Sequence, residues 1–226
     1  MTSEVALTSK KEEGEKTEFG IPIDHSFSKP ASKEQIERTK EALKKRGYDV
    51  EVVDSPDHAR SIVKKMLPLD KTIFTATSET VRLSGIDEDI NGPNSPYKSI
   101  RRELNNLDPK TPFRERVKLG AIPDVVVGSV HAITEDGRVL VASASGSQFG
   151  PYAATAEKVI WVVGSQKIVP DLNTGLRRLE MYSYPLEDVR AREKYNMPSF
   201  LAKILIFNGE RPGRINVVLV RSSIGY

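Results

Sequence analysis

The stretch KVIWVV, residues 158–163, decides the fold. Every residue after its lysine is apolar, and side chains along a β-strand point alternately to the two faces of a sheet. A strand without a polar face must be covered on both sides, as strands inside α/β sheets are. We therefore predict a central strand here, with Trp161 in the core.

Shorter apolar runs on both sides of this strand alternate with helical patterns. Ser32 and Gln35 have the spacing of a capping box that begins a helix, and Gly47 can end that helix. The alternation predicts an α/β fold with a mostly parallel sheet and helices on both faces. Further strands are expected at residues 48–53, 71–76, 125–128, 203–207 and 214–220, and helices at 33–46, 56–67, 77–85, 97–107, 112–119, 149–157, 171–181 and 186–195.

A local β-hairpin interrupts this alternation near residues 131–142. Two short apolar runs, 132–134 and 138–142, flank the pair Asp136-Gly137. An Asp-Gly pair favours the tight turn that joins antiparallel strands. The fold class is therefore α/β, mostly parallel, with one antiparallel hairpin.

The N-terminal segment has a different composition from the rest of the chain. Residues 1–31 are polar and charged and contain Gly20, Pro22 and Pro30. Such a segment lacks the apolar surface needed for a core. We expect an extended or mobile N-terminal arm over 1–31, and one α/β domain over 32–226. The alternative is that the arm docks through Phe19, Ile21, Ile23 and Phe27.

Composition excludes several classes of protein. The net charge is only +3 and the basic residues are scattered among acidic ones, so no nucleic-acid surface is expected. There is no cysteine, so no iron–sulfur cluster can be ligated by thiolates of this chain, and any cofactor stays unspecified. His25, His58 and His131 lack metal-ligand spacing, and no metal site is expected. No apolar stretch is long enough for a signal peptide or membrane span, which predicts a cytoplasmic protein.

Polar loops follow several of the predicted strands directly. In open α/β sheets, the loops at the carboxyl ends of strands converge on a ligand-binding crevice. Main-chain amides and a lysine there would suit a small anionic metabolite. The alternative interpretation is that the serines only cap helices and turns and that the lysine projects into water. The candidate ligand-binding residues are Thr77, Ser78, Ser129, Ser145, Gly146, Ser147, Gln148 and Lys167.

Glu135 is the candidate catalytic residue. It lies in the compact turn Thr-Glu-Asp-Gly, where a carboxylate could act as base or nucleophile if burial tuned its pKa. The alternative is an ordinary solvated acid in a hairpin turn.

The second half of the chain resembles the LUD family, the domain of lactate-utilisation proteins. The resemblance rests on VVVGSVHAITEDGRVLV (125–141), KVIWVVGSQKIVPDL (158–172) and RINVVLVRSSIG (214–225). It implies a fold of the NagB/RpiA/CoA-transferase-like type and a link to oxidation of L-lactate to pyruvate alongside iron–sulfur partner proteins. The family pattern points to Glu135, Asp136, Gly137, Gly146, Lys158, Gly164, Lys167 and Asp171.

Two segments depart from the family pattern. Many relatives carry an acidic residue and an arginine in the loop that reads SASGSQ here, residues 143–148. Many also carry a cysteine-bearing segment where this chain has YNMPS, residues 195–199. The ligand can therefore differ, and thiol-dependent activity is not expected.

Three functional hypotheses follow. The first is an accessory component of L-lactate or organic-acid utilisation that binds a small anionic metabolite or a partner, such as an iron–sulfur oxidoreductase subunit. The second is an isomerase or CoA-transferase-like enzyme that uses Glu135, since the Glu-Asp-Gly turn resembles the Glu-Asn-Gly turn of CoA-transferases. The third is a non-catalytic scaffold subunit.

Overall fold

A computed structural model describes residues 15–226, and a parallel sheet of six strands forms its centre. The strand β7 (Lys158–Gly164) lies between two neighbours within this sheet, and Trp161 is fully buried. The prediction of an internal strand at KVIWVV is therefore confirmed. The sheet order is β1 (Asp49–Val53), β10 (Ile215–Val220), β7, β4 (Val125–Gly128), β2 (Thr72–Thr75) and β3 (Lys98–Ser99).

A second, smaller sheet contains the predicted hairpin. Its strands are β8 (Ile168–Val169), β5 (Ala132–Thr134), β6 (Val139–Ser143) and β9 (Lys203–Phe207), in that order. β5 and β6 pair antiparallel across the Asp136-Gly137 turn, in which Gly137 has a φ of +87°. The predicted strand at 203–207 lies in this sheet, antiparallel to β6, and not beside β10.

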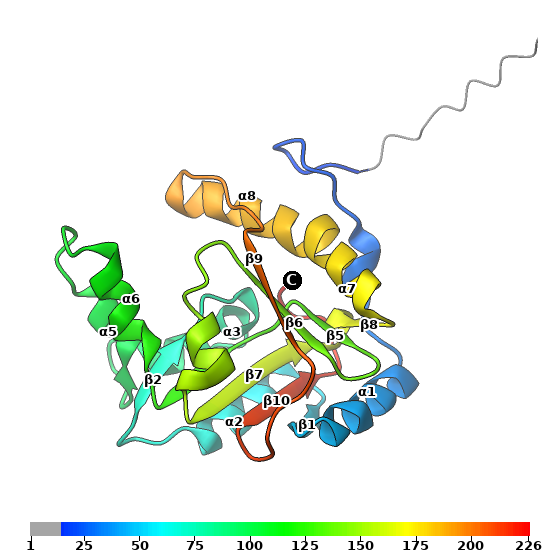
Figure 1. Ribbon diagram of the computed structural model, residues 1–226, viewed down its shortest axis with the longest axis horizontal. Coiled ribbons are helices and arrows are strands. Elements are labelled where there is room, and N and C mark those ends of the chain that lie inside the picture. Colours follow the sequence, from blue (N-terminus) through cyan, green and yellow to red (C-terminus); the bar gives the residue numbers. More distant parts are fainter. Residues whose placement is uncertain (1–14) are drawn as a thin grey trace, which may run out of the picture.

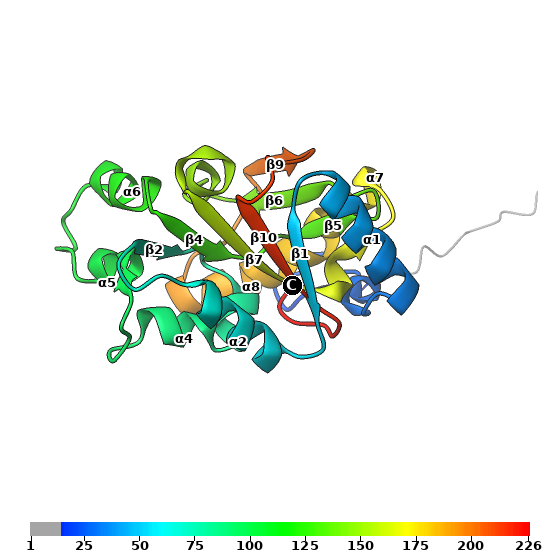
Figure 2. The same ribbon diagram turned by 90° about the horizontal axis from the view of Figure 1, so that it is seen from below.

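The six-stranded sheet is covered on both faces, as its sequence requires (Figures 1 and 2). Along β7, Ile160 and Val162 pack toward α2 (Pro56–Met66), α3 (Glu79–Leu83) and α4 (Ile86–Asn91). Val159, Trp161 and Val163 face the core shared with the second sheet and with α1 (Lys33–Lys45) and α5 (Ile100–Asn105). The outer face of the second sheet packs against a further helical layer.

That outer layer is one helical run where two separate helices were expected. α7 (Leu172–Arg178) continues through a π-helical turn (Leu179–Ser183) into α8 (Tyr184–Tyr195). Pro185, which has no N–H to donate, stands at the start of α8 directly after the wider turn. A π turn is a common way to keep a helix continuous past such a residue.

The other helices agree with the sequence to different degrees. The capping box of Ser32 and Gln35 is present at α1, and α6 spans Phe113–Ala121. The helix expected over 149–157 is only a π-helical turn, Pro151–Thr155. The short α4 was not expected, because apolar spacing is weak in that region. Among residues 15–226, no helix combines the length and apolar character needed to cross a membrane.

The predicted arm is described from residue 15 onward, and this part lies on the domain. Residues His25–Ser28 form a 3₁₀ helix, and Ile23 is buried. The Asp24 amide donates to the Met181 carbonyl at 2.8 Å, and the Ser223 hydroxyl donates to the Ser28 carbonyl at 2.7 Å. Residues 15–31 therefore contact the domain, and the prediction for residues 1–14 lies outside the described part of the chain.

Candidate functional site

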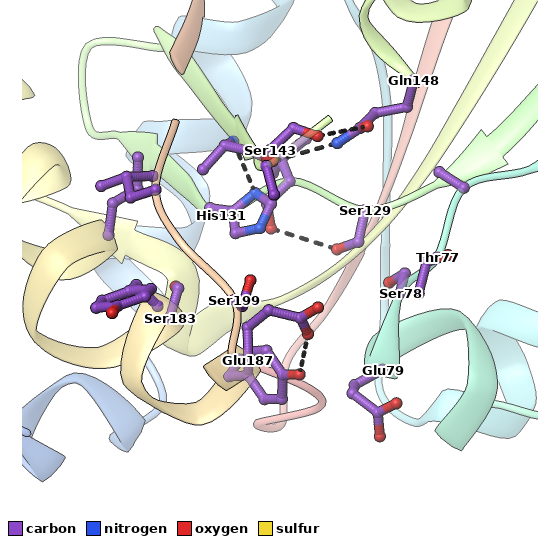
Figure 3. A pocket seen from close by; sticks show the side chains of 18 of the residues that line it. Thr77, Ser78, Glu79, Ser129, His131, Ser143, Gln148, Ser183, Glu187 and Ser199 are labelled. Atoms are coloured by element: carbon purple, nitrogen blue, oxygen red, sulfur yellow. Dashed lines mark hydrogen bonds between the residues drawn. The ribbon is translucent and has the colours of Figure 1, made fainter. Parts of the chain in front are cut away.

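A cavity of about 280 Å³ lies at the carboxyl ends of the strands β2 and β4. The segment after β7 and the loop after β6 complete its floor, and α8 and the C-terminal residue form its roof. In Figure 3, Thr77, Ser78 and Ser129 lie across the cavity from Glu187 and Ser199. Segments from six parts of the sequence therefore meet at one site.

The cavity brings together most of the residues that the sequence singled out as candidates for ligand binding. Ser129 follows β4 and Lys167 follows β7, while Ser78 is the N-cap of α3. Gly146 lies between two residues that line the cavity. The predicted residues in direct contact with the cavity are Thr77, Ser78, Ser129, Ser145, Ser147, Gln148 and Lys167.

The SASGSQ loop is held by its own hydrogen bonds. The Ser143 hydroxyl accepts from the Gly146 amide at 2.9 Å and donates to Gln148 Oε1 at 3.0 Å. Gly146 has a φ of +82°, which favours glycine in this turn. Part of the loop's polarity thus supports the turn, while Ser145 and Ser147 still face the cavity.

Lys167 is the most unusual residue of the site. Its side chain is almost completely buried, with only 2% of the residue exposed. Its Nζ lies 3.0 Å from Thr80 Oγ1 and 3.1 Å from Ser129 Oγ. No carboxylate of residues 15–226 lies within ion-pair distance of it. Burial, and to a lesser extent the positive charge of Arg178, holds the pKa of Lys167 well below its usual value.

A second buried cation lies behind this lysine. Arg178 is fully buried and donates to the carbonyls of Gln166 and His131 and to the Ser183 hydroxyl. Burial lowers its pKa to about 10, so the guanidinium stays charged at neutral pH. Its Nη2 has no hydrogen-bond partner in the described structure. The cavity floor therefore has a positive potential that no described carboxylate neutralises at close range.

His131 lines the cavity as a neutral imidazole. Its Nδ1 accepts the Ala142 amide hydrogen at 3.1 Å, which places the ring proton on Nε2. Burial, followed by the charges of Lys167 and Arg178, lowers the pKa of His131 to about 3. Part of the residue's surface faces the cavity, so solvent there moderates this effect.

The roof of the cavity contains residues that the sequence did not single out. The Glu187 carboxylate accepts two hydrogen bonds from Arg190, at 2.6 and 2.7 Å. It also accepts one from the Tyr226 hydroxyl at 2.7 Å. These residues come from a charged helix and the chain end, where no local motif marks a site.

Two glycines allow the close packing that positions the site. A Cβ on Gly128 would lie 1.8 Å from the Tyr152 hydroxyl, which donates to the Ser129 carbonyl at 3.2 Å. A Cβ on Gly164 would lie 2.2 Å from Gln166 Oε1. The Gln166 side chain in turn donates to the carbonyls of Ile224 and Gly225. The residues beside Ser129 and Lys167 are therefore fixed by the core and by the C-terminal segment.

Glu135 does not line this cavity. Its carboxylate accepts from Gln35 Nε2 at 3.0 Å and forms an ion pair with Arg38 at 2.7 Å. Burial raises the pKa of Glu135, but the hydrogen bonds from Gln35 and Arg38 outweigh it and the net shift is downward. A carboxylate held in its charged form against α1 is placed for a structural contact, and the catalytic interpretation has no support from its position.

The described residues do not include a cluster of side chains that suits a metal ion. Within 15–226, His, Asp and Glu side chains do not gather in groups of three or more that could hold a metal ion. Asp171, to which the family pattern points, is the N-cap of α7 and accepts from the Thr174 amide at 2.8 Å. Lys158 begins β7 and does not line the cavity.

Comparisons with known proteins identify the family. A crystal structure of a DUF162 family protein from Deinococcus radiodurans is similar to this chain, with a TM-score of 0.51 and 14% sequence identity. The similarity covers 84% of this chain and 99% of that one, and at this identity it shows the fold alone. No curated protein matches the chain. The LUD domain model matches residues 36–225, which is most of the sequence, and the chain therefore belongs to the LUD domain family.

Proposed function

We propose that this LUD-domain protein is an accessory component of L-lactate or organic-acid utilisation that binds a small organic anion in the cavity around Lys167. The observation that carries the proposal is a pair of buried basic groups, the charged Arg178 and the Lys167 amine, which a bound anion would hold in its protonated form, with no carboxylate partner among residues 15–226. Buried charges in proteins are ordinarily paired. An anionic ligand would supply the missing partner.

The other charged groups of the cavity are already neutralised by close partners. Glu187 is paired with Arg190, and Glu79 is paired with Arg82 at 2.7 Å. The remaining polar lining consists largely of hydroxyl groups, which can donate to a carboxylate or bind a hydroxyl substituent. A volume of about 280 Å³ leaves ample room for a small 2-hydroxy or 2-oxo acid.

Oxidation of the acid would fall to a partner in this proposal. The chain has no cysteine with which to ligate an iron–sulfur cluster, so iron–sulfur oxidoreductase subunits in the cytoplasm would carry the electrons. The LUD domain would then hold or deliver the acid.

Thermal unfolding with L-lactate and pyruvate tests the binding. At ten times the dissociation constant, a ligand of the native state adds about 1.4 kcal/mol of stability. For a chain of this size that is a rise in Tm of roughly 3–6 °C. Lys167→Met should abolish the rise, because it removes the cation and keeps the volume.

Lys118→Met is the matched control, since Lys118 is exposed on α6 and pairs with Glu115. It should leave the ligand effect unchanged. The neutral amides of the same acids should not stabilise the wild type. If neither acid raises the Tm, or if Lys167→Met responds as the wild type does, the binding proposal is wrong.

A further inference from the structure

The Ser129 and Thr80 hydroxyls both contact Lys167, and anion binding by the lysine requires neither of them. Ser129 lines the cavity at the end of β4, and Thr80 is buried on α3 behind it. The lysine Nζ lies between their hydroxyl oxygens, 3.1 Å from one and 3.0 Å from the other. A serine hydroxyl within hydrogen-bond reach of a buried amine has the geometry of a nucleophile and its base.

The hydrogen bonds around Thr80 determine which group donates a proton and which accepts one. The Thr80 hydroxyl donates to the Ile224 carbonyl at 3.2 Å, so its only proton is used and its oxygen can only accept from Lys167. A neutral lysine amine has two protons and one lone pair. One proton bonds to Thr80. The Ser129 hydroxyl donates to the Val130 carbonyl at a long 3.4 Å, and a turn of this hydroxyl toward Lys167 lets the lone pair accept the Ser129 proton.

The C-terminal segment keeps Thr80 in this orientation. The Ile224 carbonyl also accepts from Gln166 Nε2 at 3.0 Å, and the Ile224 amide donates to Gln166 Oε1 at 3.3 Å. Gly225 has a φ of +65°, and a Cβ there would lie 2.3 Å from the Thr80 hydroxyl oxygen. The segment approaches this closely only because glycine is present.

We propose that Ser129 is an acylatable nucleophile, that Lys167 is its general base and that Thr80 is a positioning residue. The substrates would be esters or thioesters of small organic acids. The geometry carries this inference: the serine faces the cavity, while the amine lies behind it without a carboxylate partner in the described structure. Burial also keeps the pKa of Lys167 low, which makes the unprotonated amine available near neutral pH.

The reaction needs only water as co-reactant. Ser129 Oγ attacks the acyl carbon while its proton passes to Lys167 Nζ, and the carbon–oxygen or carbon–sulfur bond to the leaving group breaks. The lysine returns the proton to the departing alkoxide or thiolate. Water then attacks the acyl-serine ester and gives one proton to Lys167, which passes it to Ser129 Oγ as the ester bond breaks. The products are the free acid and an alcohol or a thiol.

The walls of the cavity fit a short acyl group. Val130, Ala142, Leu179, Phe200 and Leu201 supply apolar surface beside the serine. The free acid would then pass its own proton to the neutral Lys167 amine, which leaves a carboxylate beside the protonated lysine until the acid is released. The inference uses the same cavity as the proposed function but does not depend on lactate or pyruvate as ligands.

An alkyl fluorophosphonate and p-nitrophenyl acetate are suitable probes. Peptide mapping by mass spectrometry should place the phosphonyl group on Ser129, and Ser129→Ala should lose it. Lys167→Met should slow labelling by at least about 100-fold, the lower range for loss of a general base. Ser61→Ala is the control, since Ser61 is exposed on α2 away from the cavity, and it should label at the wild-type rate.

The pH profile separates a base from a merely structural lysine. Wild-type labelling should rise as Lys167 loses its proton, and Thr80→Val should shift that rise, whereas Lys167→Met should show neither. The charged or titratable groups around the lysine are Arg178, His131 and the cavity-lining residues Glu79, Tyr152, Tyr184, Glu187, Arg190, Tyr195 and Tyr226.

Two results would overturn the inference: no labelling of the folded wild type, or equal labelling in Ser129→Ala. The thermal response to lactate and pyruvate is measured on the same Ser129→Ala protein, which keeps Lys167. A retained thermal response with no labelling of the wild type would leave anion binding standing and remove the hydrolase.

Discussion

At the scale of single residues, the basic groups of the site are buried and have no carboxylate partner among residues 15–226, and this burial lowers their pKa values. Lys167 and Arg178 lie close enough for each charge to affect the other's surroundings, and both have pKa values below the usual ones because of burial. His131 is driven to its neutral form by the same burial and by these two cations. An anionic ligand bound at the cavity floor would therefore favour the protonated forms of Lys167 and His131.

His131 should make the protein sensitive to acid. The pKa is about 3 in the folded protein and about 6.5 in the unfolded chain, so the unfolded state binds the extra proton between these values. Stability is full above pH 6.5 and falls as the pH drops toward 3. His131→Asn keeps an acceptor for the Ala142 amide and should lose about 2 kcal/mol less between pH 6.5 and pH 4.

Urea unfolding at several pH values measures this difference. His58→Asn is the control, because His58 is exposed on α2, and it should follow the wild-type curve. Parallel stability curves for His131→Asn and the wild type would mean that the imidazole is not held neutral.

At the scale of elements, local signals were read correctly and long-range partners were not. A few neighbouring residues determine the conformation of the Asp136-Gly137 turn and of β7, so the hairpin and the internal strand were predictable. The convergence of strand-end loops followed from the general geometry of α/β sheets. The partner of Glu135 is Arg38, 97 positions away, and no periodicity links them.

The roof could not be predicted for the same reason. Its contacts join the helix α8 to the last residue of the chain, and Glu187 resembles any other surface acid in the sequence. The π-helical turn at Leu179–Ser183 has no sequence signature of its own, and Pro185 suggested a break between two helices. Burial of Lys167 was likewise hidden, because its pairing with Thr80 spans 87 positions.

Glu135 should act in the contact between the hairpin and α1, and not in ligand binding. Its ion pair with Arg38 is partly exposed, so Glu135→Gln should cost at most about 1 kcal/mol at pH 7. The pKa of Glu135 is lowered in the folded protein, so this contribution is present above pH 4.5 and is lost as the pH falls further. Denaturant unfolding at pH 7 and pH 3 should show the difference between variant and wild type disappear.

The same variant should keep the thermal response to the organic acids and the labelling of Ser129. Arg38→Gln removes the other half of the pair and is expected to behave alike. Loss of the thermal response to the organic acids in a folded Glu135→Gln protein would mean that Glu135 takes part in ligand binding.

At the scale of the whole molecule, both ends of the described chain hold the outer helical layer over the second sheet (Figure 1). Near the start, the Asp24 amide bonds to the Met181 carbonyl and the Asp24 carboxylate pairs with Arg177. At the end, Tyr226 bonds to Glu187 on α8. Residues from both ends of the described chain therefore hold the helical layer that covers the cavity, although the cavity floor is built by the central strands.

Tyr226→Phe tests this closure with one atom. It removes the hydroxyl that donates to the Glu187 carboxylate and leaves the ring in place. A partly buried hydrogen bond to a charged group should contribute about 1 kcal/mol, or roughly 2–4 °C in Tm for a chain of this size. The larger effect is expected on function, since a loosened roof lets water reach the cavity and weakens the anion's attraction to Lys167.

Tyr184→Phe is the matched control, because Tyr184 lies in the same roof and its hydroxyl has no hydrogen-bond partner among residues 15–226. A double-mutant cycle of Tyr226→Phe with Glu187→Gln assigns the effect to this contact. Hydrogen exchange of the α8 amides should rise in Tyr226→Phe and stay unchanged in Tyr184→Phe. If the two single variants of the cycle are additive in stability and in the ligand response, the C-terminal residue does not hold the roof.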